Sequence, residues 1–233
     1  MGPFRRLAEG ERRRGLGDSE LIAKATPDYE IGCKRILFAS DWYSTLARPD
    51  VELFCGPVER IEPAGVVGSD GVERAAEVIV YGTGFQAQNF VAPMAIFGLD
   101  GRELNRVWRE RPEAYLGTTV SGFPNMFVLY GPNTNHGSGS VPFTLECQFS
   151  YVLDAIRRLR AGGYRWIDLR PETQEAWRRE IDERSARTVW VTGGGDNWYV
   201  NERGENTNNW PGAWLEYRRR TKRINPGDYR VAV

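Results

Sequence analysis

The sequence predicts an α/β fold in which glycine-rich turns follow buried strands and form a ligand site. Two runs of apolar, mostly β-branched or aromatic residues, 77–81 and 126–130, have the composition of buried strands. Each run leads directly into a glycine turn, at 82–85 and at 131–140. Because ligands of open α/β sheets bind at the carboxyl ends of the strands, these turns are the first candidates for a binding site.

Shorter elements are expected around these two units. Six apolar residues recur at helical spacing and predict one buried face on a helix over 143–160: Leu145, Phe149, Val152, Leu153, Ile156 and Leu159. Pro171 suits the first turn of a further helix. The charged residues 1–24 are either a helix without its packing partner or a flexible end. We also expect strands at 51–55, 58–61 and 164–169, a hairpin turn at 68–71, and a helix over 171–187.

Composition excludes several classes of protein. Lys and Arg together number 31, as do Asp and Glu, so the net charge is zero and no basic field favours nucleic acid. No apolar run reaches the roughly 18–20 residues that span a bilayer. The Arg-rich start has no apolar core typical of a secretory signal. We therefore expect no nucleic-acid partner, no membrane span and a cytoplasmic location.

The metal-ligating residues are few and scattered. Cys33, Cys55 and Cys147 form no Cys-x-x-Cys pair, and His136 is the single histidine. This pattern predicts no metal site and three free thiols in a reducing compartment. The eight tryptophans are many for 233 residues. Large aromatic side chains pack cores, and they also line cofactor and substrate cavities.

Three segments have a sequence that suits an anionic cofactor. The turn at 82–87 formally matches the dinucleotide fingerprint, but no helix pattern follows it, so a tight turn beside a strand or a cofactor is favoured. The loop at 131–140 precedes a helix, whose N-terminal N–H groups welcome a phosphate or a ring oxygen. Its alternative is an ordinary capped helix start. Lys34 and Arg35 follow Gly32 and suit phosphate binding, or else are a solvated pair.

A hydrolase is a further alternative. His136 stands near Ser138 and Ser140, which invites a nucleophile and base pair. The surrounding Gly137 and Gly139 do not form the Gly-x-Ser-x-Gly elbow, and a glycine loop does not hold the fixed geometry that a triad needs. This interpretation is the weakest of those considered.

A series of short motifs is more specific than any one of them. In chain order they are Pro27-Asp28-Tyr29, Gly32-Cys33-Lys34-Arg35, Asp41-Trp42-Tyr43, Arg48-Pro49-Asp50-Val51, 78–85, 114–117, 122–127, 131–134, Glu146 with Gln148, 196–199 and 209–212. Their order resembles the middle and carboxy-terminal part of Baeyer–Villiger-type, class B flavoprotein monooxygenases. The resemblance covers about residues 18–230.

The resemblance implies an α/β flavoprotein with two Rossmann-like domains, one for FAD and one for NADPH, of which this chain is the C-terminal part only. It implies that NADPH reduces FAD, that O₂ adds to give a flavin C4a-peroxide, and that one oxygen atom enters a ketone to give an ester or lactone. By the same resemblance Arg35 is the active-site arginine, and its guanidinium stays charged beside an anion.

The resemblance also implies roles for other residues. Lys34 is expected near the nicotinamide cofactor, with the 2′-phosphate as one contact. Five residues are expected to close over FAD: Thr83, Gly84, Phe85, Asn133 and Thr134. Three aromatic residues are expected to border the substrate tunnel: Trp198, Tyr199 and Trp210.

The chain also departs from the family pattern. The family's glycine loops for FAD and NADPH and its central Phe-x-Gly-x-x-x-His signature are absent. We therefore expect a fragment or half of a split enzyme that requires the missing N-terminal half. Its expected segments are 1–45, the end of the nicotinamide domain and linker; 46–163, part of the FAD domain; and 164–233, helical and loop-rich. The alternatives are N- or S-oxygenation, or a non-catalytic remnant.

Overall fold

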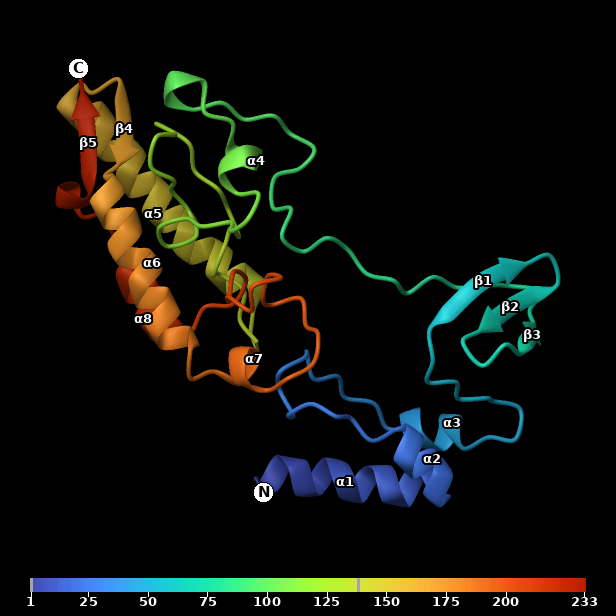
Figure 1. Cartoon of the computed structure of the whole chain (residues 1–233). Helices are drawn as coiled ribbons and strands as arrows, with labels where there is room; N and C mark the ends of the chain where they lie inside the picture. The colour runs from blue at the N-terminus through green and yellow to red at the C-terminus, as the bar shows by residue number, and fades with distance from the viewer. Residues whose placement is uncertain (1, 138) are drawn as a thin grey trace. The chain divides into compact units, whose positions relative to one another are not determined.

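The structure is a computed structural model that describes residues 2–137 and 139–233 (Figure 1). The chain divides into two compact units, one formed by residues up to Asp28 with Leu37–Phe85, the other by Tyr29–Ile36 with Gln86–Val233. These boundaries differ from the expected ones at 45/46 and 163/164. The assignment of those three segments to cofactor domains stays a prediction.

The first unit begins with three helices, α1 (Pro3–Leu16), α2 (Ser19–Lys24) and α3 (Trp42–Leu46). Of the two alternatives for residues 1–24, the helical one is confirmed over Pro3–Leu16 and Ser19–Lys24, but α1 does have a packing partner, α3. The Asp18 carboxylate starts α2 by accepting hydrogen bonds from the next helical backbone N–H groups, both at 2.9 Å. A Cβ at Gly15 would lie 2.5 Å from the Tyr43 Cβ. Glycine at this position therefore lets α1 and α3 approach closely.

The first unit continues with an antiparallel meander of β1 (Val58–Glu62), β2 (Gly65–Gly68) and β3 (Glu73–Ala75) (Figure 1). The predicted strand at 58–61 and the hairpin turn at 68–71 are confirmed. The strand predicted at 51–55 is wrong, because this segment pairs with no other strand among the described residues. Extended backbone becomes a strand only where a neighbour supplies its hydrogen bonds.

The buried strand predicted at 77–81 is also wrong. The segment forms no strand, and its side chains are exposed: Val78 by 77% and Val80 by 88%. An apolar β-branched run of this kind is stable as a strand only between neighbours and under a covering layer. The described residues supply neither, so the run ends the first unit as an exposed apolar strip.

The second unit contains two larger helices and a short two-stranded sheet. α5 (Val141–Gly162) and α6 (Pro171–Ser185) lie side by side with α8 (Trp214–Arg220), and β4 (Trp166–Leu169) pairs antiparallel with β5 (Tyr229–Ala232) (Figure 1). The predicted helices at 143–160 and 171–187 and the strand at 164–169 are thereby confirmed. The remaining elements are η1 (Leu99–Gly101), α4 (Leu104–Val107), α7 (Val189–Thr192) and η2 (Pro226–Asp228).

The buried face of α5 agrees with the predicted one only in part: Leu159 packs against the hydrophobic core, but other residues of the predicted face do not. Phe149 and Leu153 are about half exposed, at 48% and 49%, whereas Gln148 and Tyr151 are buried. Gln148 is tolerated inside because its carboxamide oxygen accepts a hydrogen bond from Tyr130 N at 2.7 Å. An apolar stripe on α5 is therefore left without a partner among the described residues.

The run at 126–130 is not a strand either. Val128 N donates one hydrogen bond to Thr118 O at 2.8 Å, and Tyr130 has a left-handed backbone with φ +55°. Without a second neighbouring strand the segment becomes an irregular loop that leads into α5. Neither of the two buried strands on which the predicted α/β sheet depended is formed in the described residues, and the two sheets that they do form are antiparallel.

Two hydrophobic cores hold the second unit together. The larger joins α5, α6, α8, β4 and β5 and includes the stacked rings of Trp177 and Trp210, 5.7 Å apart. The smaller surrounds Leu104, Trp108 and Phe123. No helix in the described part of the chain is both long enough and apolar enough to cross a membrane.

Candidate functional site

The segment Tyr29–Ile36, which carries the two predicted cations, is anchored to the loop after α7. Glu30 N donates a hydrogen bond to Gly193 O at 2.7 Å. Cys33 is fully buried, and a Cβ at Gly193 would lie 2.7 Å from the Cys33 Cβ, so only glycine fits there. This close packing fixes the backbone immediately before Lys34 and Arg35.

Lys34 and Arg35 lie among aromatic side chains. The Lys34 ammonium lies 4.4 Å from the centre of the Tyr29 ring, a cation–π contact. Arg35 is exposed, and its charge acts on two phenols. Burial raises the pKa of Tyr130 and of Tyr199, and the positive charge of Arg35 opposes this shift in both. Because neutral phenols do not neutralise a guanidinium, the positive charge of Arg35 can still attract an anion.

Asn133 and Thr134 lie buried in the loop before α5. The Asn133 side-chain amide donates to Asn206 O at 2.8 Å and to Asn209 O at 3.4 Å. The Thr134 hydroxyl donates to Gly131 O at 2.7 Å. These polar groups are therefore used inside the protein, and any role at a cofactor would come through the shape of the loop.

Two loops distant in sequence are joined at this point. Asn135 N donates to Asn208 O at 3.0 Å, and Trp210 N donates to Asn135 O at 2.8 Å. The Asn135 amide also donates to the Asn209 side-chain oxygen. The result is a short parallel bridge between residues 135 and 209. It places the tryptophan-bearing segment beside the loop that starts α5.

A pocket of about 290 Å³ lies beside these joined loops. It is lined by Gly32, Lys34, Ile36, His136, Gly137, Trp190, Tyr199, Trp210, Gly212 and Trp214. Three of the predicted site residues, Lys34, Tyr199 and Trp210, therefore meet in one cavity. Trp198 stands next to it, with its ring centre 4.5 Å from that of Tyr199.

Ion pairs between α6 and α8 hold one wall of this pocket. Arg184 pairs with Glu216 at 2.6 Å, and an Arg220 nitrogen lies 2.9 Å from Glu180. Both guanidinium groups lie over the Trp210 ring, at 5.0 and 5.7 Å from its centre. With Trp177 stacked on the same indole, Trp210 is fixed by packing on several sides.

Sequence reasoning missed three residues that line the pocket: His136, Trp190 and Trp214. His136 was considered only as a hydrolase base, although it is 6% exposed and its ring centre lies 5.2 Å from that of Trp214. Burial lowers the pKa of His136 and favours the neutral imidazole. The number of tryptophans was the available signal, but it does not say which of them meet.

The start of α5 is an ordinary capped helix. The Ser140 hydroxyl accepts a hydrogen bond from Phe143 N at 3.4 Å, which is the standard role of an N-cap serine. Ser140 is thus engaged in the cap rather than paired with His136. Ser138, the other serine of the hydrolase alternative, lies outside the described residues.

The other three predicted flavin contacts belong to the first unit. Thr83, Gly84 and Phe85 are exposed, and Phe85 is completely so. Gly84 has φ +81°, a conformation that favours glycine, and a Cβ there would meet nothing within 4 Å. The expected close approach to a neighbouring strand is therefore not made within the described residues.

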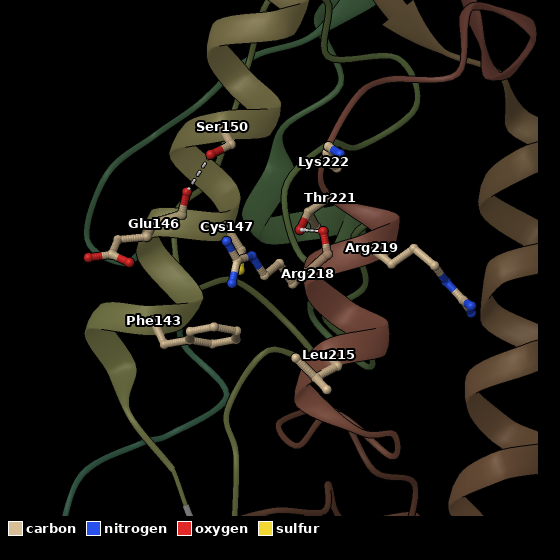
Figure 2. A pocket seen from close by; sticks show the side chains of 9 residues that line it. All are labelled: Phe143, Glu146, Cys147, Ser150, Leu215, Arg218, Arg219, Thr221 and Lys222. Carbon is tan, nitrogen blue, oxygen red and sulfur yellow. Dashed lines mark hydrogen bonds between the residues drawn. The ribbon is translucent and has the colours of Figure 1, made fainter.

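A larger groove, of about 680 Å³, lies between α5 and α8 (Figure 2). None of the predicted site residues line it. Its hydroxyl groups are engaged internally: Ser150 donates to Glu146 O at 2.9 Å, and Thr221 donates to Tyr217 O at 2.8 Å. Burial raises the pKa of the Cys147 thiol at its floor. Among the described residues no cluster of three or more His, Cys, Asp or Glu could hold a metal ion.

Solved structures with the same fold are FAD- and NADP-dependent monooxygenases. The chain aligns over 97% of its length with OTEMO in complex with FAD and NADP, at a TM-score of 0.87 and 27% identity, and covers 43% of that protein. It aligns over 96% of its length with a steroid monooxygenase bound to NADP, at a TM-score of 0.84 and 28% identity, and covers 44% of it. The fold is that of flavoprotein monooxygenases.

Comparison with sequence relatives indicates a particular class of flavoprotein monooxygenase. The chain is 39% identical to a Baeyer–Villiger monooxygenase of Streptomyces coelicolor over 99% of its length, and 36% identical to one of Pseudomonas aeruginosa over its whole length. No family model matches. In sequence and fold, the chain is similar to Baeyer–Villiger monooxygenases. It spans about 45% of the length of these relatives.

Proposed function

We propose that this chain is the C-terminal part of an NADPH- and FAD-dependent monooxygenase that converts a ketone to an ester or lactone. One atom of O₂ enters the product, the other leaves as water, and NADPH is oxidised to NADP⁺. The observation that supports this most directly is the position of Lys34 and Arg35. Lys34 lines an aromatic pocket, and Arg35 follows it in a segment held rigidly by Gly193.

The residues present fit an anionic, phosphate-bearing cofactor. Lys34 and Arg35 supply two adjacent cations, and the described residues place no carboxylate in the lining of the pocket at Lys34. Gly84 is open on its Cβ side, so a flat group can approach the backbone of Thr83 and Phe85. When bound, FAD and NADPH supply the electrons and the activation of O₂. The Rossmann-like character of the complete cofactor domains belongs to this proposal.

The chain's own residues perform orientation and charge stabilisation. Arg35 keeps a fixed positive charge where negative charge develops on oxygen during ketone oxidation, and it loses no proton in doing so. Tyr199 and Trp210 hold the apolar part of the substrate against flat surfaces. Together with Trp190 they give the pocket aromatic walls.

We further propose that the remainder of such an enzyme is the partner of this chain. The exposed strip at 78–81 in the first unit and the half-exposed Phe149 and Leu153 on α5 in the second unit are apolar surfaces of the kind that a partner covers. A cytoplasmic location fits a chain whose three cysteines form no disulfide with one another.

The test combines this chain with the N-terminal part of a related monooxygenase and supplies NADPH, isotopically labelled O₂ and a ketone. An ester that carries one labelled oxygen atom supports the proposal. Production of an N- or S-oxide from amine or sulfide substrates, with no ester from any ketone, assigns the chain to the alternative branch and contradicts the proposal.

Arg35→Ala in the same complex should lower ester formation by about 100- to 1000-fold, because one preorganised charge-stabilising group is lost. Reduction of FAD by NADPH should persist, since it does not require that charge. Arg170→Ala, which removes a guanidinium at the start of α6, is the matched control and should leave ester formation unchanged. Unchanged ketone turnover in the Arg35 variant would remove this residue from the mechanism.

A further inference from the structure

The groove between α5 and α8 has walls formed by matching faces of two helices (Figure 2). Its lining residues form two sets, one on α5 and one on α8 with the turn after it: Phe143, Glu146, Cys147 and Ser150; and Leu215, Arg218, Arg219, Thr221 and Lys222. The first set has the spacing i, i+3, i+4 and i+7, and the second set contains the same spacing. Residues spaced in this way share one face of a helix. Each wall of the groove is therefore about 10 Å, or about two helical turns, long.

The floor of the groove carries no charge. Cys147 is 6% exposed, and burial raises the pKa of its thiol, so the thiol is neutral at pH 7. The Thr221 hydroxyl donates to a backbone carbonyl of α8 at 2.8 Å. Beside this floor, Leu215 is 76% exposed and Phe143 is partly exposed, with its ring 5.9 Å from that of Trp214. An apolar side chain can pack here without leaving a buried polar group unpaired.

The rim of the groove carries unpaired positive charge. Arg218, Arg219 and Lys222 are exposed, and none of them forms an ion pair with a described residue. Arg220, on the other face of α8, differs, because its guanidinium nitrogens lie 2.9 Å from carboxylates of α6 and of α8 itself. The one carboxylate in the lining, that of Glu146, points away from the Arg218 guanidinium (Figure 2). Three cations therefore surround the groove with one carboxylate between them.

The dipole of α8 does not account for this arrangement. Cations in the last turn of a helix are stabilised by the partial negative charge at its C-terminus. That effect is the same on every face of the last turn. It gives no reason for Lys222, which follows the helix end at Arg220, to line the same groove as Arg218 and Arg219. An anionic group in the groove does give such a reason, because all three cations line the same space.

We propose that this groove docks an acidic amphipathic helix of a partner protein. The apolar face of that helix packs on Phe143 and Leu215, and its carboxylates pair with the three cations of the rim. Amphipathic helices bind grooves through anchors at i, i+3, i+4 and i+7, the spacing that both walls present. A nucleic acid fits poorly, because the chain has no net positive charge and the groove has apolar sides. The groove shares no lining residue with the pocket at Lys34, so the inference is independent of the proposed function.

The experiment measures binding of a fluorescein-labelled, stapled helical peptide to the whole 233-residue chain by fluorescence anisotropy. The staple maintains a short helix that is marginally stable alone. Leucines at i, i+3, i+4 and i+7 form its apolar face, and glutamates flank them. One control peptide has lysine in place of every glutamate, and another has serine in place of every leucine. The groove variant is Arg218→Gln with Lys222→Gln. Its matched control is Arg157→Gln with Arg160→Gln, which changes two exposed cations of α5 outside the groove.

The glutamate peptide should bind to saturation, and its affinity should fall between about 50 mM and about 500 mM salt, since exposed charges are screened. The lysine peptide should show no saturable binding. The variant that removes Arg218 and Lys222 should bind the glutamate peptide about tenfold more weakly, because two exposed ion pairs are lost. The variant at Arg157 and Arg160 should bind it as the parent does. The serine peptide should bind at least about tenfold more weakly, because the apolar contact is lost.

Equal binding of the glutamate and lysine peptides, or saturable binding of neither, would overturn the proposal on the unmodified chain. Equal affinity of the two double variants would place the peptide outside the groove, and equal affinity of the serine peptide would remove the apolar contact. Self-association of the chain that Leu215→Asp abolishes would assign the groove to a second copy. Loss of peptide binding once the N-terminal part of a related monooxygenase has bound would assign it to that part. Either of these last two results would overturn a separate partner protein.

Discussion

Asn133 offers a quantitative test of how the loop before α5 is held. Its backbone is left-handed, with φ +57°, and its side chain donates to the carbonyls of Asn206 and Asn209. When the Asn133 side chain is removed, Asn209 O still accepts a hydrogen bond from the Asn206 side-chain amide at 2.8 Å. The Asn206 carbonyl is therefore the group that loses its hydrogen bond. That loss costs about 1–3 kcal/mol. Alanine adds about 1 kcal/mol for its left-handed conformation, which asparagine tolerates better.

Asn133→Ala should therefore lower the free energy of unfolding of the second unit by about 2–4 kcal/mol. Asn133→Gly, the matched control, loses the same hydrogen bonds but adopts the conformation freely, at an entropy cost of about 0.5–1 kcal/mol. It should be the more stable of the two variants.

Urea unfolding followed by tryptophan fluorescence measures this, because Trp42 alone of the eight lies outside the second unit. Variants within 0.5 kcal/mol of the parent, taken as about the usual range for surface changes, would refute the hydrogen-bond argument. A glycine variant less stable than the alanine variant would refute the backbone argument.

Three further predictions follow from single positions. Gly117→Ala should destabilise the second unit by about 2–5 kcal/mol. The reasons are that φ at this position is +63° and that the new Cβ would lie 1.9 Å from the Thr134 Cγ2. A melting temperature equal to that of the parent would contradict this prediction. Cys55 is exposed and should react with a thiol reagent well before Cys147, whose pKa is raised by burial. Cys55→Ser should therefore remove the fast phase of thiol modification. A fast phase that survives in this variant would contradict the assignment of that phase to Cys55. Burial raises the pKa of Tyr229 to about 12, whereas the pKa of tyrosine in the unfolded chain is about 10. The stability that neutral Tyr229 contributes is therefore complete below about pH 10 and is lost as the pH rises from about 10 to about 12. The urea midpoint of Tyr229→Phe should decline less over this range than that of the parent, and parallel curves would contradict the assignment.

Local signals predicted the elements that depend on neighbours in sequence. Helical periodicity gave α5, Pro171 gave the start of α6, and the glycine and aspartate turn gave the hairpin between β2 and β3. The flavoprotein fold itself came from the order of short motifs rather than from periodicity. Except for that order, which extends over most of the chain, each of these signals is contained in one short stretch of residues.

Features that depend on distant partners could not be predicted. The runs at 77–81 and 126–130 have strand composition, but a strand also needs a neighbour, which composition does not supply. Apolar spacing favoured Leu153 as a core residue of α5, yet Gln148 is buried because a backbone N–H across the loop meets its oxygen. The pocket residues come from separate stretches of the chain, and the sequence does not show which stretches meet. Lys34 and Tyr199 could therefore each be predicted as a site residue, but His136 could not be predicted as their neighbour.

The bridge between Asn135 and Asn209 has a consequence for biosynthesis. The two residues are 74 positions apart, and a ribosome adding about 5–20 residues per second takes about 4–15 s between them. Throughout that interval the nascent 131–137 loop lacks its partners in residues 206–210, and the side chains of Asn133 and Asn135 are solvated by water. The aromatic cavity forms only after Trp210 and Trp214 have been synthesised, so a ribosome stalled before residue 206 would present an open chain to chaperones and proteases.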